Sequence, residues 1–313
     1  MMWLILRRIG AAVGMIFAVS ILAFLILSIG NDDLARNILG EAATTQSVEG
    51  LTRELGLDKP LLAQFLPWLG DLVRGDLGTS YLTREPVIDV VGDRLPVTFS
   101  LMALTIVVVA FASTGLAILA ATRRGPVDRA IQAGSIVAHA IPNYLVAMLL
   151  ASWLAVSLRL FPAAGFVPIT ESPYAWGASL ALPVVSLSLA GIAAAAQQAR
   201  GALVDVLATD YIRTLRSRGI SRRSLLWRHA MRNASPAWLT TLSLQLIGLI
   251  GGSFMIEKVF GMEGLGSIAV NSTLSGDRPV LMGIVILTTV FVATVNLLVD
   301  LALAWAIPKA RVS

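Results

Sequence analysis

The chain has 313 residues, of which 56% are hydrophobic and only 14% are charged, and its formal net charge is +5. Soluble domains carry roughly a quarter charged residues, so this composition excludes an ordinary soluble protein. The sequence contains no cysteine, which excludes disulfides, thiolate metal sites and a cysteine nucleophile.

Six uncharged stretches are long enough to cross a membrane, which takes about 20 helical residues. In chain order they cover residues 9–30, 95–122, 130–158, 172–199, 233–256 and 279–299. The strands of membrane barrels alternate over about ten residues, whereas these runs are longer and continuously apolar. We therefore expect an all-α membrane protein with six transmembrane helices. The first is interpreted as an uncleaved anchor, because its apolar run is too long for a signal peptide.

The basic residues are distributed unequally between the two sides of this predicted membrane protein. With six helices, both termini share a side with the loops that follow the second and fourth helices. That side holds fifteen of the 24 Lys and Arg residues. Because cytoplasmic loops carry the excess of positive charge, this side is predicted to be cytoplasmic. The asymmetry accounts for the net charge without a nucleic-acid partner.

Residues 31–94 form an external segment between residues 1–30, a cytoplasmic stub with the first helix, and the core at 95–313. A short helix is predicted to end at Gly56, and residues 61–74 repeat apolar side chains at helical spacing. This second stretch is predicted to be an amphipathic helix on the membrane surface. The segment either contacts an external partner or caps the helix bundle.

Polar and helix-breaking residues interrupt the apolar stretches. Pro142 and Pro183 are predicted to break the third and fourth helices. Asp300 is the one acid within a predicted helix. A charge at the centre of a membrane helix costs about 2.5–3.5 kcal/mol. We therefore favour a structural bond from Asp300 to a backbone group or an arginine over a role as a proton relay. Taken one at a time, polar side chains in such helices more often form hydrogen bonds within the helix packing than bind a ligand. As a set, the following suit a hydrated pathway for a polar solute: His139, Asn143, Gln197, Gln198, Gln245 and Asn296.

The basic loop at residues 200–235 is predicted to contain two short helices. Asp210 is expected to cap the first, which ends at Gly219 in a positive-φ conformation, and Ser221 is expected to cap the second. Within the first helix, an isoleucine and a leucine one turn apart give it an apolar face. A short helix of this kind either fits a groove on a partner or lies on anionic headgroups.

No motif for catalysis or for nucleotide binding is present in the sequence. It lacks a Gly-x-x-x-x-Gly-Lys-[Ser/Thr] phosphate loop, a His-Glu-x-x-His pair and a Gly-x-Ser-x-Gly elbow. No cluster of acids or histidines in the apolar stretches indicates a bare metal ion. We therefore do not expect an enzyme, and we expect no metal site.

The loop resembles the cytoplasmic signature of binding-protein-dependent ABC importer permeases, in the branch serving dipeptides, oligopeptides and nickel. The matching stretches are Tyr211-Ile-Arg-Thr-Leu-Arg-Ser-Arg-Gly219 and Arg228-His-Ala-Met-Arg-Asn-Ala234. Further landmarks, such as Arg74-Gly-Asp-Leu-Gly78, follow in family order along nearly the whole chain. The resemblance implies a type I ABC importer permease fold with a coupling helix that docks on an ATPase. The docking residues that it implies are Tyr211, Ile212, Arg213, Thr214, Leu215, Arg216, Arg218 and Gly219. Leu215 stands where the family pattern has a small residue, which predicts an adapted groove on the ATPase.

The resemblance also implies the partners and the location. The partners are a homologous second permease, one or two cytosolic ATPases that bind ATP and Mg in place of this chain, and an extracytoplasmic solute-binding protein. The location is the bacterial inner membrane, and the solute is a short peptide, with a nickel chelate or glutathione as alternatives. An ion-coupled secondary transporter is a rival hypothesis, although the two halves of the sequence show no paired repeats. A membrane scaffold or receptor is the third, and it requires the intramembrane polar side chains to be pure packing.

Overall fold

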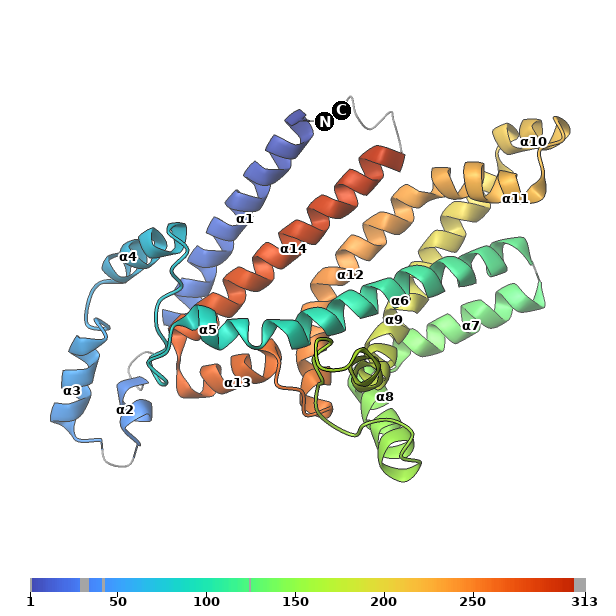
Figure 1. Ribbon diagram of the computed structural model, residues 1–313. Helices are drawn as coiled ribbons and strands as arrows, with labels where there is room; N and C mark the ends of the chain where they lie inside the picture. The colour runs from blue at the N-terminus through green and yellow to red at the C-terminus, as the bar shows by residue number, and fades with distance from the viewer. Residues whose placement is uncertain (1, 29–33, 41–42, 124, 307–313) are drawn as a thin grey trace. The chain divides into compact units, whose positions relative to one another are not determined.

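The computed structural model of the protein describes residues 2–28, 34–40, 43–123 and 125–306. Over these residues the chain is helical without a strand, so the predicted all-α fold is confirmed (Figure 1). Three of the predicted cytoplasmic basic residues, Arg124, Lys309 and Arg311, lie outside the described residues.

Five helices are long and apolar enough to cross a membrane. They are α1 (Met2–Ser28), α6 (Leu95–Thr122), α9 (Pro173–Ala208), α12 (Met231–Val259) and α14 (Arg278–Ala306). The remaining predicted span is a bent pair, and its two arms meet at 93°. Its parts are α7 (Pro126–Ala140), α8 (Asn143–Leu150) and the π-helical segment η3 (Ala151–Ser157). Counted as one span, this pair gives six candidate spans, as the uncharged stretches predicted.

Shorter helices connect these elements. They are α2 (Leu34–Leu39), α3 (Thr45–Glu54), α4 (Leu61–Val73), α5 (Val87–Gly92), α10 (Asp210–Ser217), α11 (Arg222–Ser224), the π-helical η4 (Leu225–Ala230) and α13 (Leu265–Ser275). Gly56 has a φ of +66° just beyond the end of α3, and α4 covers the predicted amphipathic stretch, so the two helices predicted between residues 31 and 94 are confirmed.

The two prolines predicted to break helices behave differently. Pro142 stands at the bend between α7 and α8, where a break was expected. Pro183 is buried inside α9, which runs without interruption past it, so the prediction of a break there is wrong. Proline removes only one backbone donor, and a helix continues through it where packed neighbours hold both sides.

The chain forms two compact units. Unit 1 contains Phe99–Met262 together with the two ends of the chain, and unit 2 contains Leu6–Thr98 and Glu263–Ala293.

Helix α9 is the centre of unit 1. It contacts α7, α8 and α12, and 56% of its most apolar stretch is buried. Asp128 of α7 and Arg200 of α9 form a two-pronged ion pair, with Nε–Oδ1 at 2.5 Å and Nη2–Oδ2 at 2.6 Å. Gln245 of α12 donates from Nε2 to the backbone carbonyl of Gly191 on α9 at 2.9 Å. A Cβ at position 191 would lie 2.5 Å from the Gln245 Oε1 atom, so a larger residue there would displace the Gln245 side chain.

Unit 2 joins α1, α4 and α14 through an aromatic cluster. Phe24 of α1 packs edge-on against Phe65 of α4 at 5.1 Å between ring centroids, and Trp68 packs against both. Met282 of α14 completes the cluster. One side of α4 therefore covers transmembrane helices of its own chain.

A polar contact ties the start of α14 to the loop before α5. The carboxylate of Asp277 accepts hydrogen bonds from the Ser80 hydroxyl and from the Tyr81 backbone N–H, the latter at 3.1 Å. Asp277 and Ser80 are both buried. The neighbouring Arg278 donates to Gln64 of α4 at 3.0 Å. We call Ser80, Tyr81 and Asp277 the external clamp.

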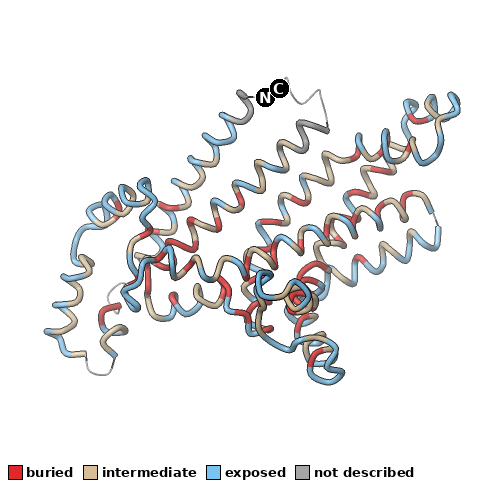
Figure 2. The backbone as a smooth tube through the Cα atoms, viewed as in Figure 1, coloured by how far each residue is buried: buried red, intermediate tan, exposed pale blue. Residues whose placement is uncertain are grey.

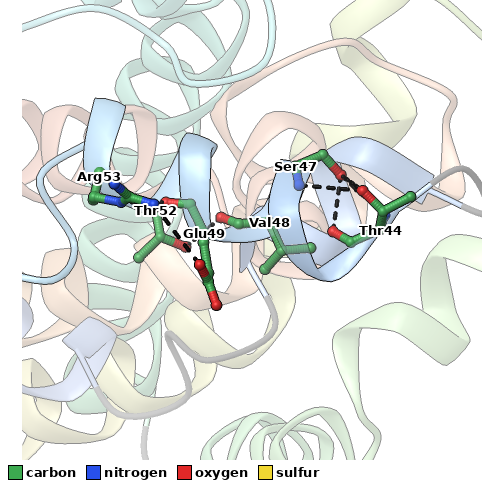
Figure 3. Close-up of polar contacts among 6 residues, drawn as sticks. All are labelled: Thr44, Ser47, Val48, Glu49, Thr52 and Arg53. Atoms are coloured by element: carbon green, nitrogen blue, oxygen red, sulfur yellow. Dashed lines mark hydrogen bonds and ion pairs between the residues drawn. The ribbon is translucent and has the colours of Figure 1, made fainter.

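Helix α3 begins with a capping box (Figure 3). The Ser47 N–H donates to Thr44 Oγ1 at 3.2 Å, and the Thr44 N–H donates to Ser47 Oγ at 2.9 Å. These bonds satisfy two of the backbone donors that a helix start leaves free, and they fix where this exposed helix begins.

Candidate functional site

The loop at residues 200–235 folds as two short helices between α9 and α12, as predicted (Figure 1). Gly219 has a φ of +77°, and Ser221 accepts a hydrogen bond from the Ser224 N–H at 3.4 Å, so both predicted end signals are confirmed. The prediction that Asp210 caps α10 is wrong by one position. Thr209 has the extended backbone of an N-cap residue, and Asp210 is the first helical residue. Its carboxylate accepts from Arg213 at 3.0 Å in the first turn, where the helix dipole favours negative charge.

The apolar face of α10 packs on its own chain. Ile212 is fully buried in a cluster with Leu203 of α9, and Leu215 packs against the same cluster. We call this cluster the α10 seat; its buried members are Ala121, Leu203, Ile212, Leu225, Ala230 and Ala234. The apolar face of α10 is therefore covered within its own chain, and Leu215 is half-buried there.

The outward side of α10 carries the polar residues. Tyr211, Arg213, Thr214 and Arg216 are exposed, as is Arg218 just past the end of the helix, and the segment is mostly pale blue in Figure 2. Tyr211 Oη and His229 Nδ1 of η4 are hydrogen-bonded at 2.8 Å, which ties α10 to the start of the next transmembrane helix. Helix α10 is therefore anchored on its own chain by its apolar face, and it presents basic residues on its exposed side.

Sequence reasoning missed the seat and the Tyr211–His229 bond. The seat combines residues from α6, α9, α10, η4 and α12, and periodicity within α10 identifies its apolar face without saying what covers it. A signal for the bond was available, because both residues lie in the two family stretches that drew attention to the loop.

The six candidate pathway residues lie on five helices, α7, α8, α9, α12 and α14. No hydrogen bond joins any two of their side chains within the described residues. His139 and Asn143 flank the Pro142 bend, and the Asn143 Oδ1 atom is buried without a donor in the described part of the chain.

The other pathway candidates lie on three helices. Gln197 and Gln198 are exposed on α9, Gln245 is tied to α9 by its bond to Gly191, and Asn296 is half-buried on α14. Asp300 belongs to α14, but its side chain lies outside the described residues.

Two family descriptions match the chain and together cover nearly all of it. Residues 113–312 match "binding-protein-dependent transport system inner membrane component", and residues 1–102 match the N-terminal region of such components. The chain belongs to this family. It is an ABC importer permease and a multi-pass membrane protein, as the loop signature predicted.

Curated relatives match this permease from end to end. A probable peptide ABC transporter permease, y4tP of Sinorhizobium fredii, is 34% identical over 98% of both chains. The glutathione transport system permease GsiC of Escherichia coli is 33% identical over 98% of both chains. The oligopeptide transport system permease AppB of Bacillus subtilis is 31% identical over 97% of this chain and 98% of its own.

Among solved structures, a chain of the MetNI methionine ABC transporter in an inward-facing conformation has the same fold. The TM-score is 0.52 at 19% identity, and the match covers 77% of this permease and 99% of that chain. The predicted type I ABC importer permease fold is confirmed.

Proposed function

We propose that this permease is the transmembrane subunit of an ATP-driven importer of short peptides. In this proposal it forms the translocation pathway with a homologous second permease, and α10 is the helix on which a cytosolic ATPase docks. The observation that carries the proposal is the seating of α10. Its apolar face is anchored on its own chain through Ile212, while Arg213 and Thr214 are left exposed for a partner.

The seat gives a physical route for coupling. A displacement of α10 by a partner would be carried by the packed α10 seat into the ends of α9 and α12, because buried apolar side chains transmit displacement. The Tyr211–His229 bond adds a second link to η4, which continues into α12. In this scheme the basic loops and both termini are cytoplasmic, ATP and Mg are bound by the partner ATPases, and residues 31–94 face the solute-binding protein outside.

A short peptide is the solute that the relatives favour. Their names refer to peptides, oligopeptides and glutathione, which is itself a small peptide. A nickel chelate remains the alternative within the same class of importer.

The experiment that tests this function is mass spectrometry of proteins that co-purify with the tagged chain in mild detergent from its native host. We expect a second permease, one or two phosphate-loop ATPases and a solute-binding protein, whose ligand can then be screened among di- and oligopeptides. Isolation of the chain alone, under conditions that preserve other membrane complexes, would contradict the docking role of α10.

Replacing Gly219 with Val should reduce peptide uptake several-fold while leaving membrane insertion intact. A branched residue at a φ of +77° costs about 1–2 kcal/mol, and nothing lies within 4 Å of the added Cβ, so the effect is confined to the backbone at the end of α10. Uptake of labelled peptide per inserted permease measures it. Gly219→Asn is the matched control, because Asn tolerates this conformation. Equal uptake by the two variants would mean that the end of α10 does not matter for coupling.

A further inference from the structure

A cleft of about 730 Å³ lies beside α10 in unit 1, and its alanine and leucine lining residues belong to the α10 seat or pack against it. Its floor is apolar, and its rim is basic. The floor residues are Ala121, Leu207, Leu225 and Leu226, and the rim residues are Arg123, Arg216, Arg222 and Arg223. The volume is in the range of pockets that hold small organic ligands.

Within the described residues, no acidic side chain pairs with the basic residues of this cleft. No acidic side chain is among the lining residues, and none of the four arginines forms an ion pair with a described residue. Other arginines of the same region do have such partners: Arg200 pairs with Asp128, and Arg213 pairs with Asp210. Four cations around one cleft therefore favour an anionic ligand.

The position of the cleft limits what that anion can be. Arg123 directly follows the end of the transmembrane helix α6, and Leu207 lies in the last turn of α9, so the cleft is level with the helix ends. Trp227 also lines it and is 55% exposed. Exposed tryptophan is typical of the membrane–water interface, and basic pockets at the cytoplasmic ends of transmembrane helices bind anionic headgroups. The apolar lining residues can contact an acyl chain, whereas they offer no favourable interaction to a free phosphate ion.

We propose that this cleft binds an anionic phospholipid of the cytoplasmic leaflet, with its phosphate among the four arginines and its acyl chain along the leucine floor. Because Arg216 belongs to α10, the lipid would join the coupling helix to the end of α6 and the start of η4. The inference rests on the cytoplasmic orientation given under the proposed function.

The test uses the full-length permease, delipidated in mild detergent, and compares phosphatidylglycerol with phosphatidylcholine by native mass spectrometry. We expect phosphatidylglycerol to bind more tightly, and Arg222→Gln/Arg223→Gln to weaken its binding at least about tenfold, since each interfacial arginine contributes about 1 kcal/mol. The matched control is Arg129→Gln/Arg228→Gln, which removes two exposed arginines that do not line the cleft. Gel filtration confirms that both variants are folded.

Four results would overturn the proposal. Equal binding of the two lipids, or equal loss in the control, would mean that the cleft does not select an anionic headgroup. Displacement of phosphatidylglycerol by millimolar inorganic phosphate, with the same stabilisation by phosphate alone, would assign the arginines to a soluble anion. Loss of the lipid whenever ATPases are bound would make the cleft part of a protein interface.

The lipid measurement is independent of the co-purification experiment. A lipid preference without co-purified ATPases would contradict the proposed function and leave the lipid site standing. Co-purified ATPases without a lipid preference would contradict the lipid site and leave the proposed function standing.

Discussion

Replacing Ile212 with Asp should detach α10 from its seat and abolish peptide uptake. The side chain is fully buried among apolar residues, so the exchange loses the burial of a large aliphatic group and places a carboxylate where no partner is available. Together these effects cost about 3–5 kcal/mol. A helix of eight residues has little stability of its own, so we expect local unfolding of α10 and not of the whole permease.

Limited trypsin digestion of inside-out vesicles measures this detachment directly. Arg213 and Arg216 lie on α10 and Arg218 directly follows it, and unfolding should expose the bonds after them at least about tenfold more often. Ser217→Asp is the matched control, because it adds the same charge at an exposed position of α10 and costs at most about 1 kcal/mol. Ile212→Val should keep most of the uptake. Normal uptake and unchanged digestion of Ile212→Asp would mean that the seat does not hold the helix.

Much of the fold could be predicted from the sequence because the membrane imposes simple rules on it. Each long helix needs an uncharged run, and the runs located all of them, including the third at its Pro142 bend. The break predicted at Pro183 was wrong, because the sequence shows the proline but not the neighbouring residues that bury it within the continuous helix α9.

The candidate site could be predicted only in part, for the same reason. The C-terminal end of α10 depends on a local signal, Gly219, which was found, whereas its start was misplaced by one position. What its apolar face touches depends on residues from α6, α9 and α12, so reasoning from α10 alone left open whether that face meets a partner or anionic headgroups. The clefts and clamps that join distant segments have no periodicity, so neither the basic cleft beside α10 nor the external clamp could be anticipated.

The external clamp leads to the second large effect: Asp277→Leu should release the loop before α5 from the start of α14. The substitution leaves the Ser80 hydroxyl and the Tyr81 N–H without their acceptor at a buried site, which costs about 1–3 kcal/mol for each group. The Ser80 oxygen also accepts from the N–H groups of Leu82 and Thr83, so the turn that follows loses its organising residue as well.

Trypsin added to right-side-out vesicles should then cleave after Arg84, in the released turn, at least about tenfold faster than in the unmodified permease. Glu85→Leu is the matched control, since it removes an exposed acid from the same loop, and Asp277→Asn should give an intermediate rate because one acceptor oxygen remains. Cleavage of Asp277→Leu no faster than of Glu85→Leu would mean that apolar packing alone holds this loop. Faster cleavage of Asp277→Leu would show that a contact between segments almost 200 residues apart stabilises this loop. That contact joins the segment at residues 31–94 to the start of the last transmembrane helix.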